Sequence, residues 1–154
     1  MGVAPLSTTH VTHLSVDVGD PIDLADTPDG ARRLVPIVGG RATGAVLSGL
    51  VVPGAVDTQI RRTETHTDID AAYAILTTDG ERVYVRNRGI RVASAEDTAS
   101  LAEGRTVDAA RVYFRGFVRL ETSVPRLAWM NDRLFVARGE RYPTTVEIDV
   151  FTVD

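Results

Sequence analysis

Short runs of alternating apolar and polar residues recur along nearly the whole chain. The run nearest the C-terminus shows the pattern most cleanly, because Val146, Ile148 and Val150 alternate with Glu147 and Asp149. Successive side chains of a strand point to opposite faces of a sheet, so this pattern predicts strands that are buried on one face. We expect strands at residues 8–18, 32–38, 43–52, 56–62, 69–77, 82–88, 110–122, 127–130, 134–138 and 145–153.

Glycine, proline, asparagine and aspartate separate these runs. The Asp-Gly pair at 79–80 predicts a hairpin between two strands, and the Asn-Asp pair at 131–132 predicts another. The Gly-Gly pair at 39–40 is expected to end the preceding strand as a bulge or a turn. Residues 19–31 hold two prolines and an Asp-Gly pair, and we expect a loop or a wide hairpin connection there.

One segment departs from the alternation. Residues 94–104 predict a short helix, because Ser94 can cap its first turn, alanines fill it and Gly104 ends it. The chain shows no βαβ pattern and no repeat. It therefore predicts one domain, residues 1–154, of the all-β class: an antiparallel β-barrel of roughly 8–10 strands with this helix outside or across one end. A barrel is favoured over a sandwich because closure removes strand edges and can hold one small ligand.

The composition narrows the possible chemistry. Of the 154 residues, 44% are hydrophobic and 25% are charged, none is cysteine, and all 17 basic residues are arginine. Disulfides, thiol nucleophiles, thiolate metal sites and lysine Schiff bases are therefore excluded. The net charge of -4 argues against nucleic acid as a partner.

Targeting and cofactor motifs are missing from the sequence. No apolar run approaches the ~20 residues of a membrane span, and the first residues do not resemble a signal peptide, so we expect a cytoplasmic protein without a membrane partner. No glycine-rich phosphate loop precedes a helix. His10 and His13 are three residues apart and so are expected on opposite faces of a strand, while His66 falls in a polar loop. We therefore expect neither a transition metal nor any other cofactor.

Polar side chains interrupt the strand-like runs between residues 48 and 89. Asp57 and Gln59 lie two apart and share a face, which suits a proton donor or acceptor beside an amide that orients a substrate. A solvated strand end is the alternative. Asp68 and Asp70 also share a face, and two close carboxylates can raise one pKa and produce a general acid. Here the alternative is a pair of exposed loop aspartates.

Other residues are candidates for the wall of a cavity. Asn87 falls on the apolar face of its strand, so its amide either binds a ligand carbonyl or closes a hydrogen-bond network in the core. Tyr73, Glu121 and Trp129 are further candidates, although Tyr and Trp more often belong to a core. Residues 113–119 alternate arginine with aromatic residues, and this face predicts a homodimer or a higher homo-oligomer.

Several motifs taken together resemble the DUF3237 family of small bacterial and fungal proteins. The resemblance runs through nearly the whole chain and implies an antiparallel β-barrel with a central cavity, and oligomerisation. The motifs are Asp29-Gly30-Ala31-Arg32-Arg33, Pro36-Ile37-Val38-Gly39-Gly40, Val52-Pro53-Gly54, Asp57-x-Gln59, Asp70-Ala71-x-Tyr73, Val85-Arg86-Asn87-Arg88-Gly89, Tyr113-Phe114-Arg115, Leu120-Glu121-Thr122, Trp129-Met130-Asn131 and Leu134-Phe135-Val136.

Two positions depart from the family pattern. Members usually carry Asp-Trp-Gln where this chain has Thr58 in the middle, and Asp-Ala-Arg-Tyr where it has Ala72 in the third place. Arg62 stands where the family has an arginine. If Thr58 and Ala72 line the cavity, the pocket of this protein is roomier and less cationic than that of other members.

These features predict a cofactor-free enzyme that moves protons with carboxylates on a small, largely apolar molecule, such as a polyketide-like or aromatic compound, inside the barrel. Cyclisation, isomerisation, and addition or loss of water fit these residues. Asp57 is the expected proton donor or acceptor and Asp70 the second carboxylate. A non-catalytic carrier of a hydrophobic ligand and a structural interaction protein are the alternatives. The residues expected to bind the substrate are Gln59, Arg62, Tyr73, Asn87, Arg88, Glu121 and Trp129.

Overall fold

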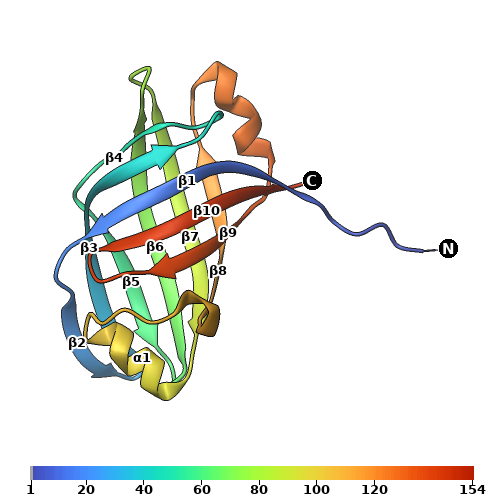
Figure 1. Ribbon diagram of the computed structural model, residues 1–154. Helices are drawn as coiled ribbons and strands as arrows, with labels where there is room; N and C mark the ends of the chain where they lie inside the picture. The colour runs from blue at the N-terminus through green and yellow to red at the C-terminus, as the bar shows by residue number, and fades with distance from the viewer. Residues whose placement is uncertain (1) are drawn as a thin grey trace.

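Eight antiparallel strands close into a barrel in the computed structural model, which describes residues 2–154. The ring runs β1, β10, β9, β8, β7, β6, β5, β3 and returns to β1, while β2 and β4 extend the sheet beside β3 (Figure 1). The predicted all-β barrel is therefore confirmed. The strands are β1 Thr8–Val18, β2 Ile22–Thr27, β3 Gly30–Thr43, β4 Gly49–Val51, β5 Ala55–Arg61, β6 His66–Thr77, β7 Arg82–Val92, β8 Tyr113–Glu121, β9 Phe135–Arg141 and β10 Thr145–Val153.

The longest strand, β3, closes the barrel. Its first half pairs with β5 and its second half pairs with β1, so it belongs to both sides of the ring. The prediction that Gly39-Gly40 ends a strand was wrong, because the strand continues to Thr43. A bulge does occur there: Asp17 pairs with Gly39, whereas Val18 pairs with Ile37. Gly40 has a φ of 135°, and a Cβ on it would collide with the backbone of β1.

Further local predictions fail for identifiable reasons. The strand predicted at residues 43–52 is interrupted, because residues 44–48 form a bend between β3 and β4. Residues 19–31 contain the short strand β2 instead of only a loop. Residues 125–132 form a 3-10 helix, so the predicted hairpin around 131–132 does not exist. Pro125 starts this helix, and the side chain of Asn131 exchanges two hydrogen bonds of 2.9 Å with the backbone of Thr122. The segment folds back onto the end of β8 and covers one end of the barrel.

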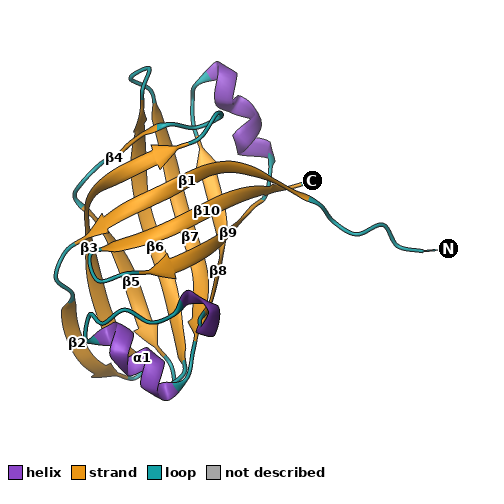
Figure 2. Ribbon diagram, viewed as in Figure 1, coloured by secondary structure: helices purple, strands orange, loops and turns teal. Residues whose placement is uncertain are grey.

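The predicted helix is confirmed and lies across the opposite end (Figure 1). Helix α1 spans Ala95–Ala102, and the Ser94 hydroxyl accepts a hydrogen bond of 3.0 Å from the backbone of Asp97. Arg111, in the short 3-10 helix Ala109–Arg111, binds Asp97 with two hydrogen bonds of 3.1 Å and anchors α1 to the start of β8. Figure 2 shows that helical segments lie at the two ends and that strands form the wall.

The interior of the barrel divides into an apolar part and a polar part. The apolar part is filled by side chains that are almost fully buried, among them Leu14, Ile75, Val85, Leu120 and Phe135. The polar part lies toward α1 and holds buried Asp57, Gln59 and Arg91. Among residues 2–154, no helix combines the length and the apolar character that crossing a membrane requires.

Candidate functional site

The predicted site residues separate onto two faces of one wall, formed by β5, β6, β7 and β8. Asp57 pairs with Ala71, and Ala71 pairs with Asn87, so these three positions share the inner face. Asp70 pairs with Arg88, and both face outward. Alternation along each strand therefore brings Asp57, Gln59, Tyr73 and Asn87 together inside the barrel and Arg62, Asp70 and Arg88 together outside it.

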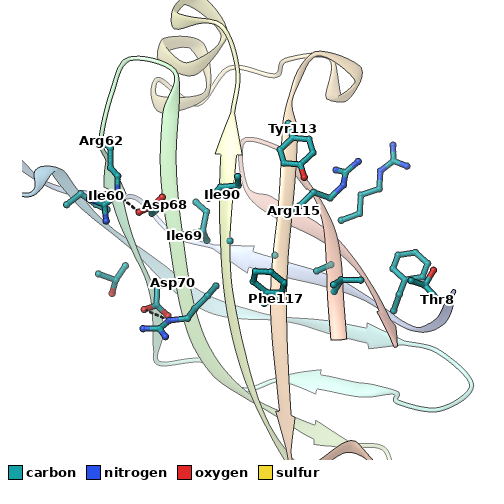
Figure 3. A pocket seen from close by; sticks show the side chains of 18 of the residues that line it. Thr8, Ile60, Arg62, Asp68, Ile69, Asp70, Ile90, Tyr113, Arg115 and Phe117 are labelled. Atoms are coloured by element: carbon teal, nitrogen blue, oxygen red, sulfur yellow. Dashed lines mark hydrogen bonds and ion pairs between the residues drawn. The ribbon is translucent and has the colours of Figure 1, made fainter. Parts of the chain in front are cut away.

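The outer face carries a broad depression of about 900 Å³, which we call the outer concavity. Figure 3 shows side chains from β5 to β8 spread over it, with Phe117 near its middle and Asp70 at one side. Thr58, one of the two positions that depart from the family pattern in the sequence, lies on its wall. The residues that line it are Thr8, Arg32, Thr58, Ile60, Arg62, Asp68, Ile69, Asp70, Arg88, Gly89, Ile90, Tyr113, Arg115, Gly116, Phe117, Val136, Ala137, Arg138 and Phe151.

Two aspartates of the outer concavity are held by arginines. Arg86 donates to the two carboxylate oxygens of Asp70 at 3.2 and 3.1 Å, and Arg88 donates at 3.5 Å. The hydrogen bonds from Arg86 are the main reason that the pKa of Asp70 lies below its ordinary value. Asp70 is therefore ionised at neutral pH.

Asp68 has a similar environment on the same face. Its carboxylate pairs with Arg62 and accepts a hydrogen bond of 2.8 Å from His66. Partial burial is the largest single influence and favours the neutral form, but the hydrogen bonds from Arg62 and His66 outweigh it and lower the pKa of Asp68. Both outer carboxylates are thus ionised and fixed in position.

Asp57 has the opposite character on the inner face. It is 8% exposed, its Oδ2 accepts a hydrogen bond of 2.8 Å from Gln59 Nε2, and its Oδ1 accepts one of 3.2 Å from the backbone N–H of Asp70. Burial raises the pKa of Asp57, against the hydrogen bond from Gln59 and the positive charges of Arg91 and Arg141. The two carboxylates expected to work as a pair are therefore linked through a backbone amide, while their acid groups face opposite sides of the wall.

Tyr73 and Asn87 complete the inner cluster. Burial, with the nearby charge of Asp57, raises the pKa of Tyr73. The hydroxyl of Tyr73 and the Oδ1 of Asn87 are buried, and neither has a hydrogen-bond partner among the described residues. Asn87 Oδ1 therefore does not close a network in the core, which was one of its two expected roles. An unpaired buried polar atom costs about 1–3 kcal/mol, so both atoms are available to a ligand or a water molecule.

Three arginines of the inner face were missed by the sequence analysis. Arg33 on β3, Arg91 on β7 and Arg141 on β9 approach one another at the end covered by α1. Burial is the main reason that the pKa of each lies below its ordinary value, and the positive charge of Arg33 lowers the pKa of Arg91 and of Arg141 further. Arg33 and Arg91 line a cavity of about 70 Å³ together with Gln59. The missed signal was the length of β7: the predicted strand stopped at residue 88, and continuing its alternation from Asn87 puts Arg91 on the inner face.

Glu121 and Trp129 lie outside both clusters. Glu121 accepts a hydrogen bond of 2.6 Å from Arg119 on the outer face, and Trp129 packs at 6.1 Å from the ring of Phe135 near the end opposite α1. The structure therefore brings neither of them to Asp57 or Asp70.

The histidines of β1 also differ from expectation. A register shift between His10 and Thr12 turns both His10 and His13 toward Asp149, and each contacts its Oδ1 at 2.9 Å. The prediction of opposite faces was wrong because this bulge adds a residue to the strand. Within residues 2–154, no three His, Asp or Glu side chains converge in a way that could hold a metal ion.

Comparison with known proteins places this barrel in a family. The model of the family described as "Protein of unknown function (DUF3237)" matches residues 6–153. A UPF0311 protein of Bradyrhizobium diazoefficiens is 39% identical over 148 residues, covering 96% of this chain and 97% of that protein. A conserved protein of unknown function from Rhodopseudomonas palustris has a crystal structure that matches with a TM-score of 0.93 at 37% identity, over 99% of this chain and 100% of that one. The crystal structure of an enzyme from Penicillium herquei matches over the whole of both chains with a TM-score of 0.72 at 17% identity, which shows a shared fold.

Proposed function

This protein belongs to the DUF3237 family, and from the geometry of its outer concavity we propose that it is a cofactor-free enzyme that transfers protons on a small, largely apolar molecule bound there. The observation that carries this proposal is the combination of a depression of about 900 Å³ with two aspartates fixed in its wall. The barrel interior offers far less room, because its apolar part is filled and the cavity beneath α1 measures about 70 Å³.

The lining suits an aromatic or polyketide-like substrate. Sites for small molecules usually measure about 300–1,000 Å³ and combine apolar walls with a few placed polar groups. Here Ile60, Ile90, Phe117 and Val136 supply apolar surface. Five arginines line the same depression against two aspartates, so it attracts a substrate with oxygen atoms that are anionic or become so.

Asp70 is the proposed proton acceptor. Its lowered pKa keeps it in the basic form at neutral pH, and a substrate that covers it would exclude water and strengthen its interactions. Arg88, which pairs with Asp70, and Arg62, which pairs with Asp68, would stabilise a phenolate or enolate oxygen that forms when the proton leaves. In an isomerisation the same proton returns to a different carbon atom. In a loss of water it protonates the departing hydroxyl group as the C–O bond breaks, and addition of water is the reverse. In a cyclisation the enolate carbon attacks a carbonyl group of the same molecule and the proton goes to the alkoxide oxygen that forms, so none of these reactions gains or loses electrons.

The Penicillium herquei structure supports the general class of this proposal. That protein is described as an enzyme and shares the fold at 17% identity. It supports the use of this barrel as a catalytic scaffold, and the choice of residues rests on the geometry of the present chain.

Asp57 remains a second proposed catalytic carboxylate for any substrate group that enters the barrel. Its raised pKa suits a proton donor, and Gln59 beside it lines the cavity beneath α1. The inner and outer assignments make different predictions, because a ligand in the outer concavity contacts Asp70 and does not contact Asp57.

Hydrogen–deuterium exchange tests the proposal without knowledge of the natural substrate. Aromatic and cyclic ketones are incubated with the protein in D2O, and proton NMR follows the loss of the acidic C–H signal. We expect Asp70→Asn to slow the catalysed exchange by roughly 10²–10⁴-fold. Asp79→Asn is the matched control, because Asp79 lies exposed in the hairpin after β6, pairs with Arg126 and does not line the outer concavity.

Three outcomes separate the assignments. Exchange lost in Asp70→Asn and kept in Asp57→Asn supports the outer site. The reverse pattern moves the chemistry to the inner face. Ligands that bind to the outer concavity without any exchange would instead identify a carrier.

A second proposed role of the same face is self-association. Phe117 is 77% exposed and is flanked by Arg115 and Arg119, and aromatic residues with arginine are enriched in protein interfaces. We expect light scattering to give at least the mass of a dimer and Phe117→Ser to lower it. A monomer mass at every accessible concentration would reject this role.

A further inference from the structure

We propose that the inner cavity beneath α1 is a binding site for a small oxyanion, held by Arg91 and Arg33 with the hydroxyls of Thr67 and Thr98. The cavity measures about 70 Å³ and is lined by residues of β3, β5, β6, β7 and α1. Helix α1 lies across the ends of these strands (Figure 1). Exposed Arg61 and Asp23 also line it, so it reaches solvent at its rim. Arg32 lines both this cavity and the outer concavity, but the four residues proposed to hold the anion line this cavity alone, and the proposal does not depend on the chemistry of the outer concavity.

Arg91 is the central observation. Its side chain is 8% exposed, yet no hydrogen bond or ion pair joins its guanidinium to another residue of the described chain. It lies 5.7 Å from the centre of the Phe114 ring, which supports the cation on one side and offers no acceptor. Gly139 makes room for that ring, because a Cβ there would meet three ring atoms at 3.0 Å. A buried guanidinium without an acceptor is costly unless an anion completes its hydrogen bonds.

Neighbouring groups add further donors. Arg33 donates from Nη2 to the carbonyl of Ala102 at 2.9 Å, while its Nε is buried without a partner among residues 2–154. Thr67 pairs with Arg91 across β6 and β7, and Thr98 faces the same cavity from α1. Both threonines are buried, and hydroxyl groups can donate to an anion.

The charges around the cavity are unbalanced. Arg33, Arg91 and Arg141 approach one another, and burial is the main reason that the pKa of Arg91 falls to about 10. Arg91 still carries its charge at neutral pH. Two carboxylates face the group: Asp57, which hydrogen-bonds to Gln59 and to a backbone amide, and the exposed Asp23. An anion in the cavity would offset the positive charge of Arg91, because neither of these carboxylates forms an ion pair with its guanidinium.

The size of the cavity defines the class of ligand. A water molecule needs about 10–15 Å³ measured in this way, so the cavity accommodates about five heavy atoms. Phosphate, sulfate and a short carboxylate such as acetate fit that limit. Guanidinium groups bind both kinds of oxyanion through two parallel hydrogen bonds.

Thermal unfolding in the presence of defined anions tests the proposal. The dialysed protein is titrated with sodium phosphate, sodium sulfate or sodium acetate against sodium chloride at matched ionic strength. We expect a saturable rise in Tm with at least one oxyanion. We expect Arg91→Gln to weaken the apparent binding by about tenfold or more, since each hydrogen bond to a charged group is worth roughly that factor or more. Arg119→Gln on the outer face is the matched control and should keep the full response.

The anions also separate the two kinds of ligand. A response to phosphate or sulfate indicates a tetrahedral anion, and a response to acetate alone indicates a carboxylate. An equal response to chloride, or an unchanged response in Arg91→Gln, would overturn the proposal. If Arg91→Gln does not fold, Thr98→Val serves instead. Diffraction from crystals soaked in selenate should then show an anomalous peak beside Arg91, and peaks only on exposed arginines would reject the site.

Discussion

The two faces of the wall formed by β5 to β8 carry similar residues under different electrostatic conditions. On the outer face, Asp68 and Asp70 are partly exposed and lie in ion pairs with arginines. On the inner face, Asp57 and Arg91 are buried, and no ion pair joins them within the described residues. The outer pairs hold ionised carboxylates in place, whereas the inner groups remain incompletely paired. Residue type alone therefore does not define the chemistry of a site, because the face of the strand decides how each charge is solvated.

Packing differs between the faces in the same way. Inside, the apolar part is filled, and two small cavities lie near the arginines. Outside, the depression is open and has an aromatic residue at its centre. Surface ion pairs contribute at most about 1 kcal/mol each to stability, so the outer charges are not needed for folding. The inner face supports the fold and a small ionic ligand, and the outer face is free to serve a larger one.

Truncating one phenylalanine on each face should give the largest difference. Phe135 is 1% exposed inside the barrel, and Phe117 is 77% exposed outside it. Phe135→Ala should lower the free energy of unfolding by about 3–5 kcal/mol, because it removes buried surface and leaves a cavity. Phe117→Ala should change it by less than about 0.5 kcal/mol. Urea unfolding measures both values.

Protein concentration provides the control for this pair. If Phe117 lies in a contact between subunits, the cost of Phe117→Ala will grow as the protein concentration rises. Equal costs for the two variants at low concentration would contradict the division between a filled interior and an open outer face.

The same division explains what the sequence could reveal. Alternation correctly predicted the bounds of β1 and β10 and placed Asn87 on an inner face, because β7 and β10 follow a period of two and β1 departs from it only at one bulge. It failed at His10 and His13, where a bulge changes the phase. It could not show which face would be hollow, because the outer concavity depends on the curvature of several strands that are distant in sequence.

The inner arginines Arg33 and Arg91 show a second limit of prediction from the sequence. A charged residue in an alternating strand is ordinarily assigned to solvent, so the alternation that puts Arg91 on the inner face of β7 was not enough to predict that it is buried. Their position depends on α1 covering one end of the barrel, which joins β3, β7 and the helix in space. The two predicted carboxylates were likewise identified as residues of interest, while their separation by the wall required the pairing of β5 with β6.

A larger residue at position 58 should have the second largest effect, which is on the binding of a ligand in the outer concavity. Thr58 lines the outer concavity, and the family resemblance of the sequence implies a tryptophan at this position. Thr58→Trp should fill part of the space and weaken a ligand seated there by an overpacking cost of about 1–3 kcal/mol, or roughly 5–150-fold in Kd. Calorimetric titration with a ligand found by the exchange assay measures the change. Thr58→Ser is the control, and an unchanged affinity in Thr58→Trp would place the ligand elsewhere.

The two carboxylates should respond to pH with opposite signs. The folded pKa of Asp57 is raised above its ordinary value of 3.8, so the folded state keeps a proton that the unfolded chain has lost. Wild-type stability therefore falls as pH rises from about 3.8 through the folded pKa of Asp57, and Asp57→Asn removes that loss. The folded pKa of Asp70 is lowered, so its contribution is present above 3.8 and disappears as pH falls through the folded value.

Thermal unfolding of both variants between about pH 3 and about pH 8 measures this contrast. Relative to wild type, Asp57→Asn should become more stable as pH rises, and Asp70→Asn should become slightly less stable. The effect at Asp70 should be small because its carboxylate is partly exposed. Parallel curves for the two variants would mean that burial does not distinguish the carboxylates.

The smallest expected effect concerns the pH dependence of catalysed exchange. Arg86 makes two hydrogen bonds to Asp70 and is the main cause of its lowered pKa, whereas Arg88 makes one longer contact. Arg86→Gln should therefore raise the pKa of Asp70 and move the acidic limb of the rate profile to higher pH. Arg88→Gln should move it less, and Arg119→Gln, which lies outside the outer concavity, should leave it in place. A general base that becomes more basic also reacts faster once ionised, so the plateau for Arg86→Gln should rise unless Arg86 is needed to hold the carboxylate. A profile that moves equally in all three variants would assign the acidic limb to another group and remove Asp70 as the base.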